Sequence, residues 1–408
     1  MGELEKEMRI VYIHQYFKTP EEGGATRSYY LAKGLVQAGY EVDLITGDSR
    51  HYDLKKIDGI TVHYLPVSYD QKFGFTRRVF SFLSFVRKAK NLIPKLPRPD
   101  LFYISSTPLT TGLIGLWAKR KFAIPYIFEV RDIWPEAPIQ VGAIKNPLIK
   151  AYLRKKEEKI YRNAIKLVGL SPGIVTHLKA KAPDREIHLI PNFSDPGYFY
   201  PVKKHSSENK RNLNISYTGA LGKVNALEEL LEFASWSQRE NKPFNFIIMG
   251  KGSEESSLRK MAVNLNLKNV RFEPFGPKKR VNEILAESDM AWISFADFPI
   301  LNTNSPNKFF DAIASGKAII INHRGWVNRL VTQNNLGVSA LNKDWPGLSE
   351  NLETLLSKPE KLKEMQQNAV RLSGEFFTEE IAVKRLLHTL DSNKHPLTQA
   401  HEAYIRIA

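Results

Sequence analysis

Residues 9–46 read RIVYIHQYFKTPEEGGATRSYYLAKGLVQAGYEVDLIT, and this stretch decides the fold class. Its opening, Arg9–His14, is a short apolar run bounded by polar residues, which is typical of a buried strand. Helical periodicity then covers Thr26–Ala38, and Glu41–Thr46, EVDLIT, is predicted to be a second strand. A strand, a glycine-containing loop, a helix and a strand in this order predict the start of a parallel α/β sheet.

The same alternation continues along the chain and restarts once. Further strands are predicted in the first half at residues 60–65, 101–104, 123–129, 166–170 and 187–190. A polar stretch without periodicity, Asp195–Asn212, follows them and is predicted to be a linker. In the second half, strands are predicted at residues 213–218, 244–249, 270–274, 290–294 and 318–322.

This pattern predicts an α/β protein with two Rossmann-like, doubly wound parallel sheets that face a cleft. Ligands of such sheets bind outside the carboxyl ends of the strands. We expect a first domain at residues 8–195 and a second at 212–375. A C-terminal helix at 376–391 is expected to return to the first domain.

Length and composition agree with two soluble domains. The chain has 408 residues, of which 42% are hydrophobic and 25% charged. It contains no cysteine, which excludes disulfides and thiolate metal sites. No run reaches the ~18 apolar residues of a membrane helix, and Met1–Met8 is too acidic for a secretory signal. We therefore expect a cytoplasmic protein.

The formal net charge is +16, which points to nucleic acid, an anionic membrane or a phosphorylated substrate as partner. The segment Lys72–Arg98 mixes basic residues with phenylalanines and aliphatic residues. Such a pattern is typical of reversible attachment to an anionic membrane surface. Alternatively, the phenylalanines belong to the core and the basic residues form its solvated face. No nucleic-acid-binding motif is present, so we expect no nucleic-acid partner, although the charge keeps that class as an alternative.

A dense charged cluster, EVRDIWPE, follows the predicted strand at residues 123–129. Its Arg131, Asp132 and Glu136 could hold a hydroxylated acceptor or relay a proton. The alternative is structural, with Asp132 capping a turn and Arg131 as its ion-pair partner. The position at a strand end favours the functional interpretation.

Three glycine loops also follow predicted strands, and glycine lets a backbone approach an anion closely. They are Gly23-Gly24, Gly219-Ala-Leu-Gly222-Lys223 and Gly250-Lys-Gly252-Ser253. Free N–H groups at a helix start could cradle a phosphate, with Lys223 as counter-charge. Each loop could equally be a flexible connection, or a turn with a helix cap.

The run NSPNKFFDAIASGK at residues 304–317 places Lys308 and Asp311 on one face of a predicted helix. Lys308 could meet a phosphate while Asp311 accepts hydrogen bonds from ribose hydroxyls. The alternative is an ordinary surface ion pair, which many helices carry. The neighbouring motifs favour the ligand-binding interpretation.

With these motifs, the sequence resembles glycosyltransferase family 4, whose members are retaining enzymes of the GT-B fold. The likeness covers residues 8 to 390 and rests on the opening stretch quoted above, on SPGIVTHL, IPNFSDPGYFYP, YTGALGKVNALEELLEFA and SPNKFFDAIASGKAIIIN. The pair RDIWPE and NSPNKFFDAIASGK looks closest to the branch that transfers N-acetylated sugars in O-antigen or capsule assembly.

The resemblance implies a nucleotide-sugar donor, with UDP favoured, and neither a metal nor another cofactor. Lys223 and Lys308 would stabilise the departing diphosphate, and Arg131 and Asp132 would face the sugar and acceptor. Trp134 and Glu136 would lie on the acceptor side. The nucleotide-sugar-binding residues would be Gly23, Gly24, Gly219, Gly222, Gly250, Gly252, Pro274, Phe275, Ser305, Pro306, Asn307 and Asp311.

The chain departs from the family pattern at three places. The family has two acidic residues eight apart, whereas Thr303 stands eight before Asp311. Ala220 and Asn225 stand where many relatives have arginine and lysine. The basic and aromatic segment Lys72–Arg98 favours an acceptor at the inner membrane face, a lipid-linked pyrophosphate sugar, and a glycan is the other acceptor expected. A nucleotide-sugar 2-epimerase of the same shape is the alternative enzyme, and it would need a carboxylate and histidine cluster.

Overall fold

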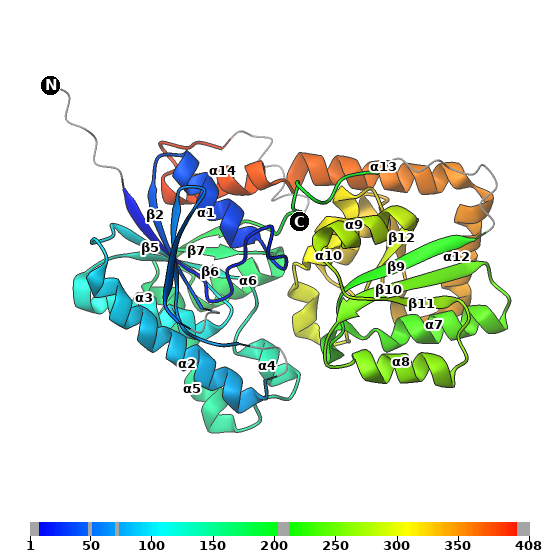
Figure 1. Cartoon of the computed structure of the whole chain (residues 1–408), viewed down its shortest axis with the longest axis horizontal. Helices are drawn as coiled ribbons and strands as arrows, with labels where there is room; N and C mark the ends of the chain where they lie inside the picture. Colours follow the sequence, from blue (N-terminus) through cyan, green and yellow to red (C-terminus); the bar gives the residue numbers. More distant parts are fainter. Residues whose placement is uncertain (1–7, 48–50, 70–72, 203–211, 398–408) are drawn as a thin grey trace. The chain divides into compact units, whose positions relative to one another are not determined.

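The computed structural model describes residues 8–47, 51–69, 73–202 and 212–397, apart from the Phe75 side chain (Figure 1). These residues form two compact units. Within the described ranges, the first unit comprises the residues up to 191, residues 303–305 and those from 380 onward, and the second comprises residues 192–302 and 306–379. Three parts of the sequence discussed above lie outside the described residues: Met1–Glu7 at the N-terminus, Lys72 of the basic segment, and residues 203–211 of the predicted linker.

An eight-stranded sheet forms the centre of the first unit. Its strands are β1 Arg9–Ile13, β2 Glu41–Thr46, β3 Asp53–Ile57, β4 Ile60–Tyr64, β5 Leu101–Ser105, β6 Tyr126–Val130, β7 Lys166–Gly169 and β8 Glu186–Leu189. They lie in the order β3-β4-β2-β1-β5-β6-β7-β8. The chain therefore winds outward from β1 in one direction and from β5 in the other. The carboxyl ends of β1 and β5 mark the switch point where such sheets bind ligands.

Helices cover this sheet and connect its parallel strands. They are α1 Arg27–Gln37, α2 Phe75–Leu92, α3 Gly112–Phe122, α4 Glu136–Gln140, α5 Pro147–Asn163, α6 Pro172–Lys181 and α14 Glu379–Leu390, with short 3-10 turns η1 Ile93–Lys95 and η2 Leu109–Thr111. Strands such as β5 and β6 are buried at every position because both faces of the sheet are covered, and nearly all of their residues are apolar.

The last helix of the first unit, α14, packs on α1 at a glycine. A Cβ on Gly34 would lie 2.5 Å from the methyl groups of Val383, so only glycine lets the helices approach this closely. Arg385 of α14 also donates to the main-chain oxygen of Leu189 at 3.4 Å. Figure 1 shows α14, at the red end of the colour scale, beside the blue α1.

A six-stranded parallel sheet forms the centre of the second unit. Its strands are β9 Leu213–Ala220, β10 Phe244–Lys251, β11 Val270–Glu273, β12 Met290–Ile293, β13 Ala318–Ile321 and β14 Gly337–Ser339. The order β11-β10-β9-β12-β13-β14 puts its switch point between β9 and β12. The helices are α7 Glu228–Arg239, α8 Glu255–Asn264, α9 Lys278–Glu287, α10 Asn307–Ala314, α11 Trp326–Gln333, α12 Trp345–Ser357 and α13 Pro359–Phe376. Three 3-10 turns are η3 Lys223–Asn225, η4 Pro299–Thr303 and η5 Leu341–Lys343.

The fold class is as predicted, and the differences lie in local elements. β3, an antiparallel edge strand, and the three-residue β14 were not expected. The C-terminal segment forms two helices, α13 up to Phe376 and α14 from Glu379. No helix in the described residues is both long and apolar enough to span a membrane.

Candidate functional site

In the second unit, the side chain of Lys308 lies at the switch point of the sheet. Its ammonium group donates three hydrogen bonds: to the Tyr217 hydroxyl at 3.2 Å, the Asn225 side-chain oxygen at 2.8 Å and the Ser294 main-chain oxygen at 3.2 Å. It also lies 4.6 Å from the ring centre of Tyr217 and 4.5 Å from that of Phe295. Every one of these partners is neutral.

This neutral environment leaves the Lys308 charge uncompensated. Among the described residues, no carboxylate forms an ion pair with it. Desolvation of the ammonium group lowers its pKa from 10.5 to about 7, because burial disfavours the charged form. A phosphate oxygen would supply the missing negative charge, so this lysine is suited to bind an anion.

Asp311 lies one turn further along α10, and its pKa is shifted in the opposite direction from that of Lys308. Burial raises the pKa of its carboxyl group to about 7, an effect reduced by the Lys278 charge and by the hydrogen bond from Ser194. The Ser194 hydroxyl donates to Asp311 Oδ1 at 3.2 Å. The Lys278 ammonium in turn forms a 2.6 Å ion pair with Asp195. Asp311 is thus a partly shielded acceptor for which a hydroxyl group is a suitable ligand.

Close backbone contact requires glycine at two positions, Gly250 at the end of β10 and Gly252 just after it. A Cβ on Gly250 would lie 2.0 Å from the main-chain oxygen of Gly219, and one on Gly252 would lie 2.1 Å from that of Leu221. Both Gly219 and Gly250 are inside strands, one beside the other. A Cβ on Gly219 would lie 3.6 Å from Lys308 Cδ, so this glycine borders the lysine.

The other predicted residues of the second unit vary in exposure. Gly222 and Lys223 stand at the start of η3, and Lys223 is exposed. Pro274 and Phe275 are exposed after β11. Pro306 and Asn307 are the N-cap and the first residue of α10, and the buried Ser305, which precedes them, belongs to the first unit.

His323 was not predicted as a site residue, although it follows β13 closely. Its ring is buried, and burial together with the charge of Lys308 lowers its pKa to about 3. It packs edge-on against Phe295 at 4.9 Å between ring centres. His323 therefore adds a neutral, buried imidazole to the surroundings of Lys308. Its position just after a strand was the only feature of the sequence that could have indicated it as a site residue.

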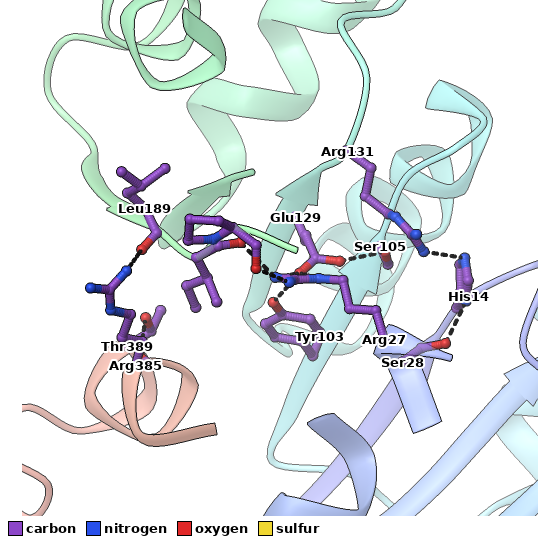
Figure 2. Close-up of polar contacts among 12 residues, drawn as sticks. His14, Arg27, Ser28, Tyr103, Ser105, Glu129, Arg131, Leu189, Arg385 and Thr389 are labelled. Carbon is purple, nitrogen blue, oxygen red and sulfur yellow. Dashed lines mark hydrogen bonds and ion pairs between the residues drawn. The ribbon is translucent and has the colours of Figure 1, made fainter. Parts of the chain in front are cut away.

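In the first unit, Arg27 and Glu129 form a fully buried ion pair (Figure 2). Arg27 donates to Glu129 Oε2 from Nε at 3.0 Å and from Nη2 at 2.8 Å. Burial raises the pKa of Glu129, but the charge and hydrogen bonds of Arg27 outweigh this effect and hold the pKa at about 2. Tyr103 and Ser105 also donate to the carboxylate, at 2.9 and 2.7 Å. This acid therefore has a structural role.

Arg27 also anchors the main chain that follows β8, at the end of the N-terminal segment of the first unit. Its guanidinium group donates to the main-chain oxygens of Ile190 at 2.9 Å and Pro191 at 2.6 Å. Sequence reasoning did not identify Arg27, although it follows the predicted glycine loop directly. Gly23 and Gly24, four and three residues before Arg27, adopt φ values of +72° and +81°. Their conformation therefore favours glycine whatever they bind.

Arg131 lies next to this ion pair but has a different partner. Its Nη1 donates to His14 Nε2 at 3.0 Å, and Ser28 Oγ lies 2.8 Å from His14 Nδ1. Figure 2 shows Arg131, His14 and Ser28 in one hydrogen-bonded row. Asp132, the alternative partner considered from the sequence, is exposed and accepts a hydrogen bond from Thr107 at 3.0 Å.

Trp134 and Glu136, which follow β6, contact the neighbouring helices α2 and α5. The Trp134 ring lies edge-on to Phe82 of α2 at 6.1 Å, and Glu136 forms a two-bonded ion pair with Arg154 of α5 at 2.7 and 3.1 Å. The Arg154 hydrogen bonds lower the pKa of Glu136, so its carboxylate stays ionised. The structure thus brings Arg131, Asp132 and Trp134 to one edge of the sheet.

The described residues contain no cluster of three or more histidine, aspartate or glutamate side chains arranged to hold a metal ion.

Comparisons with known proteins agree with this architecture. Residues 22–192 match the family described as "Glycosyl transferase 4-like domain", and residues 202–371 match "Glycosyl transferases group 1". A search of curated protein sequences gives no significant match.

Solved structures resemble nearly the whole chain. Sucrose-phosphate synthase from Thermosynechococcus elongatus matches with a TM-score of 0.74 and 15% identity, over 95% of this chain and 99% of that one. Anabaena HepE in complex with UDP-glucose matches with a TM-score of 0.65 and 15% identity, over 95% and 100%. WaaG, a glycosyltransferase involved in lipopolysaccharide biosynthesis, matches with a TM-score of 0.64 and 13% identity, over 91% and 98%. Both family matches and two doubly wound sheets together show that the chain is a glycosyltransferase of the GT-B fold.

Proposed function

We propose that this glycosyltransferase takes its sugar from a UDP-sugar, with retention at the anomeric carbon, and transfers it to a lipid-linked or glycan acceptor in surface polysaccharide synthesis. The observation that carries the donor assignment is Lys308, a desolvated cation held by three neutral groups at the switch point of the second sheet. Its neighbour Asp311 supplies an acceptor on the same helix.

The diphosphate of the donor is the ligand proposed for Lys308. A charged oxygen accepts a hydrogen bond from an ammonium group more strongly than Tyr217 or Asn225 can. As the bond between sugar and diphosphate breaks, negative charge grows on the leaving oxygen, and Lys308 would stabilise it. The exposed Lys223 at the start of η3 would add a second positive charge.

The ribose is the ligand proposed for Asp311, because two vicinal hydroxyl groups can donate to one carboxylate. Such donors favour the ionised carboxylate, whereas the diphosphate favours the protonated lysine. Both groups have a pKa of about 7 in the free protein. Donor binding near pH 7 is therefore expected to protonate Lys308 and deprotonate Asp311 together.

UDP is favoured over other nucleotides by the resemblance in sequence, and one structural neighbour, HepE, was solved with UDP-glucose. The involvement of WaaG in lipopolysaccharide biosynthesis supports a role in surface polysaccharides. An N-acetylated sugar is proposed on the motifs RDIWPE and NSPNKFFDAIASGK alone.

A thermal-shift comparison of UDP, GDP and ADP tests the donor assignment. A ligand at 100 times its Kd stabilises a protein by about 2.7 kcal/mol, so UDP should raise the melting temperature clearly. Lys308→Met should lose most of this shift. Lys242→Met is the matched control, since it removes one charge of the same unit from an ion pair with Glu353. Equal stabilisation by GDP would refute the UDP assignment.

Attachment to the cytoplasmic face of a membrane is proposed from α2. Phe82, Phe85 and Val86 of this helix are buried, so part of the basic and aromatic segment belongs to the core. Phe80 and Leu83, however, are 73% and 48% exposed. An apolar pair with basic neighbours is suited to an anionic lipid surface.

Sedimentation with vesicles tests this attachment. Wild-type protein should sediment with anionic vesicles at low salt and less so at high salt, because the Debye length falls from ~10 Å at 0.1 M to ~3 Å at 1 M. Replacing Phe80 and Leu83 by serine should abolish sedimentation, whereas Val263→Ser, an exposed apolar residue of α8 in the other unit, should not. Wild-type protein that stays in the supernatant would contradict the proposal.

A further inference from the structure

Arg131 stands at the carboxyl end of β6, beside the switch point of the first sheet. Its main-chain N–H donates to Ser106 Oγ at 3.0 Å, which anchors the residue to the loop after β5. The nearest buried carboxylate, Glu129, already accepts hydrogen bonds from Arg27, Tyr103 and Ser105. In the described part of the chain, no carboxylate forms an ion pair with Arg131.

The hydrogen bond to His14 determines which histidine nitrogen carries the proton. An arginine side chain has only donors, so His14 Nε2 must accept. Nδ1 therefore carries the hydrogen and donates to Ser28 Oγ, 2.8 Å away. The ring is neutral, in agreement with its low pKa of about 3, which burial and the charges of Arg131 and Arg27 produce.

A neutral partner has a specific effect on an arginine. A carboxylate, such as the one that holds Arg27, fixes the guanidinium group and also cancels its charge. The His14 imidazole fixes it and leaves the charge in place. A guanidinium group held in this way offers parallel N–H donors that match the oxygens of a phosphate.

Aromatic rings extend from His14 along the same edge of the unit. His14 and Tyr16 lie 6.4 Å apart between ring centres, Tyr16 and Tyr69 4.6 Å, and Tyr69 and Phe82 6.1 Å. Trp134 follows, 6.1 Å from Phe82. Tyr16, Tyr69 and Trp134 are only half-buried, so part of each residue is accessible to an apolar or sugar group.

We propose that Arg131 binds a phosphate oxyanion of the acceptor, as found in a lipid diphosphate sugar, and that His14 is the positioning residue that orients Arg131 without neutralising it. The half-buried aromatic rings beside them would contact the rest of the acceptor. This inference rests on the proposed transferase function and names the chemistry of its second substrate.

Binding of inorganic pyrophosphate in the presence of saturating UDP tests the site. UDP occupies the donor site, so calorimetry then reports a second anion site. Arg131→Gln should weaken this binding about 10- to 100-fold, as expected for a lost charge-assisted interaction. Arg120→Gln is the matched control, because it removes an exposed arginine of α3 in the same unit. Unchanged pyrophosphate binding in Arg131→Gln would overturn the proposal.

The role of His14 has its own tests. His14→Phe keeps a ring but removes the acceptor, and it should lower pyrophosphate affinity as much as Arg131→Gln, while His14→Gln should restore part of it. Nitrogen-15 NMR should find His14 neutral, with the hydrogen on Nδ1, from pH 5 to 8. A hydrogen on Nε2, or protonation near pH 6.5, would refute the positioning role.

Measuring UDP affinity in the same variants separates this inference from the proposed function. UDP should bind Arg131→Gln as it binds the wild type. A parallel loss of UDP and pyrophosphate affinity would place Arg131 in the donor site and overturn the acceptor assignment. If UDP does not bind at all, the proposed donor is wrong. Pyrophosphate binding to Lys308→Met, with and without Arg131→Gln, then still tests the Arg131 site.

Discussion

Replacing Lys308 by methionine should change how the stability of the second unit depends on pH. In the folded protein the ammonium group has a pKa of about 7, against 10.5 when it is solvated. Between these values the unfolded chain holds a proton that the folded chain lacks, so wild-type stability rises with pH. Below pH 7 the Lys308 amine is protonated in both the folded and the unfolded chain, and the folded protein then bears the full free-energy cost of burying the charge. Methionine cannot titrate, so the variant lacks this rise.

The size of the effect follows from the two pKa values. One pH unit well inside the window corresponds to about 1.4 kcal/mol. Because the folded group is half-titrated at pH 7, the wild type should gain about 2 kcal/mol relative to Lys308→Met between pH 7 and 9. The lost hydrogen bonds to Tyr217, Asn225 and Ser294 shift the variant by an amount that depends little on pH, so the slope is the informative quantity.

Urea unfolding at pH 7, 8 and 9 gives this slope. Tryptophan fluorescence reports on the second unit through Trp292, which is fully buried in its core. Saturating UDP should flatten the wild-type curve, because a bound diphosphate keeps Lys308 protonated. Parallel curves for wild type and variant without ligand would refute the argument that Lys308 is a desolvated cation.

Three further predictions concern other groups. Asp311→Asn should weaken UDP binding in calorimetry, and an unchanged UDP affinity would exclude Asp311 from the donor site. The same variant should be more stable than the wild type above pH 7, because the folded wild type then carries a desolvated carboxylate that the variant lacks. Arg27→Met or Glu129→Gln should each lower the free energy of unfolding by about 3–5 kcal/mol, as breaking one side of a buried ion pair does. In the wild type, the stabilisation from this ion pair should be lost as pH falls from 4.5 towards 2. A loss of less than 1 kcal/mol in urea titrations of the variants would contradict the prediction. Gly250→Ala should lower the melting temperature, since its Cβ would lie 2.0 Å from a main-chain oxygen of β9, whereas Gly74→Ala, with open space around it, should not.

Strands buried on both faces were the part of the fold most visible in the sequence. The strand predicted at Glu41–Thr46 coincides with β2, which is buried after its first residue. The edge strand β3, DLKKI, has three exposed residues and carries no such signal. β14 has only three residues, too few for any period to appear. Sequence periodicity thus reports burial, and it fails where a strand lies at an edge.

Candidate residues could be proposed from the sequence because polar groups after strands are recognisable, but the partners of these residues could not. Lys308 was predicted, yet its contact with Asn225 joins residues 83 positions apart. His14 ends the first predicted strand, and its contact with Arg131 spans 117 positions. Only the order of the strands brings such residues together. The proton position on His14 follows from that contact and has no signal in the sequence.

The union of α14 with the first unit has a consequence for synthesis on the ribosome. The groove at Gly34 receives Val383, and the two parts of the unit are separated along the chain by almost the whole second unit. At translation rates of ~5–20 residues per second, α14 emerges roughly 10–40 s after β8. During that interval the nascent first unit exposes an apolar surface around Gly34. A protein cut before α14 should retain that surface permanently, and a circular permutant in which α14 directly precedes β1 should fold its first unit without waiting.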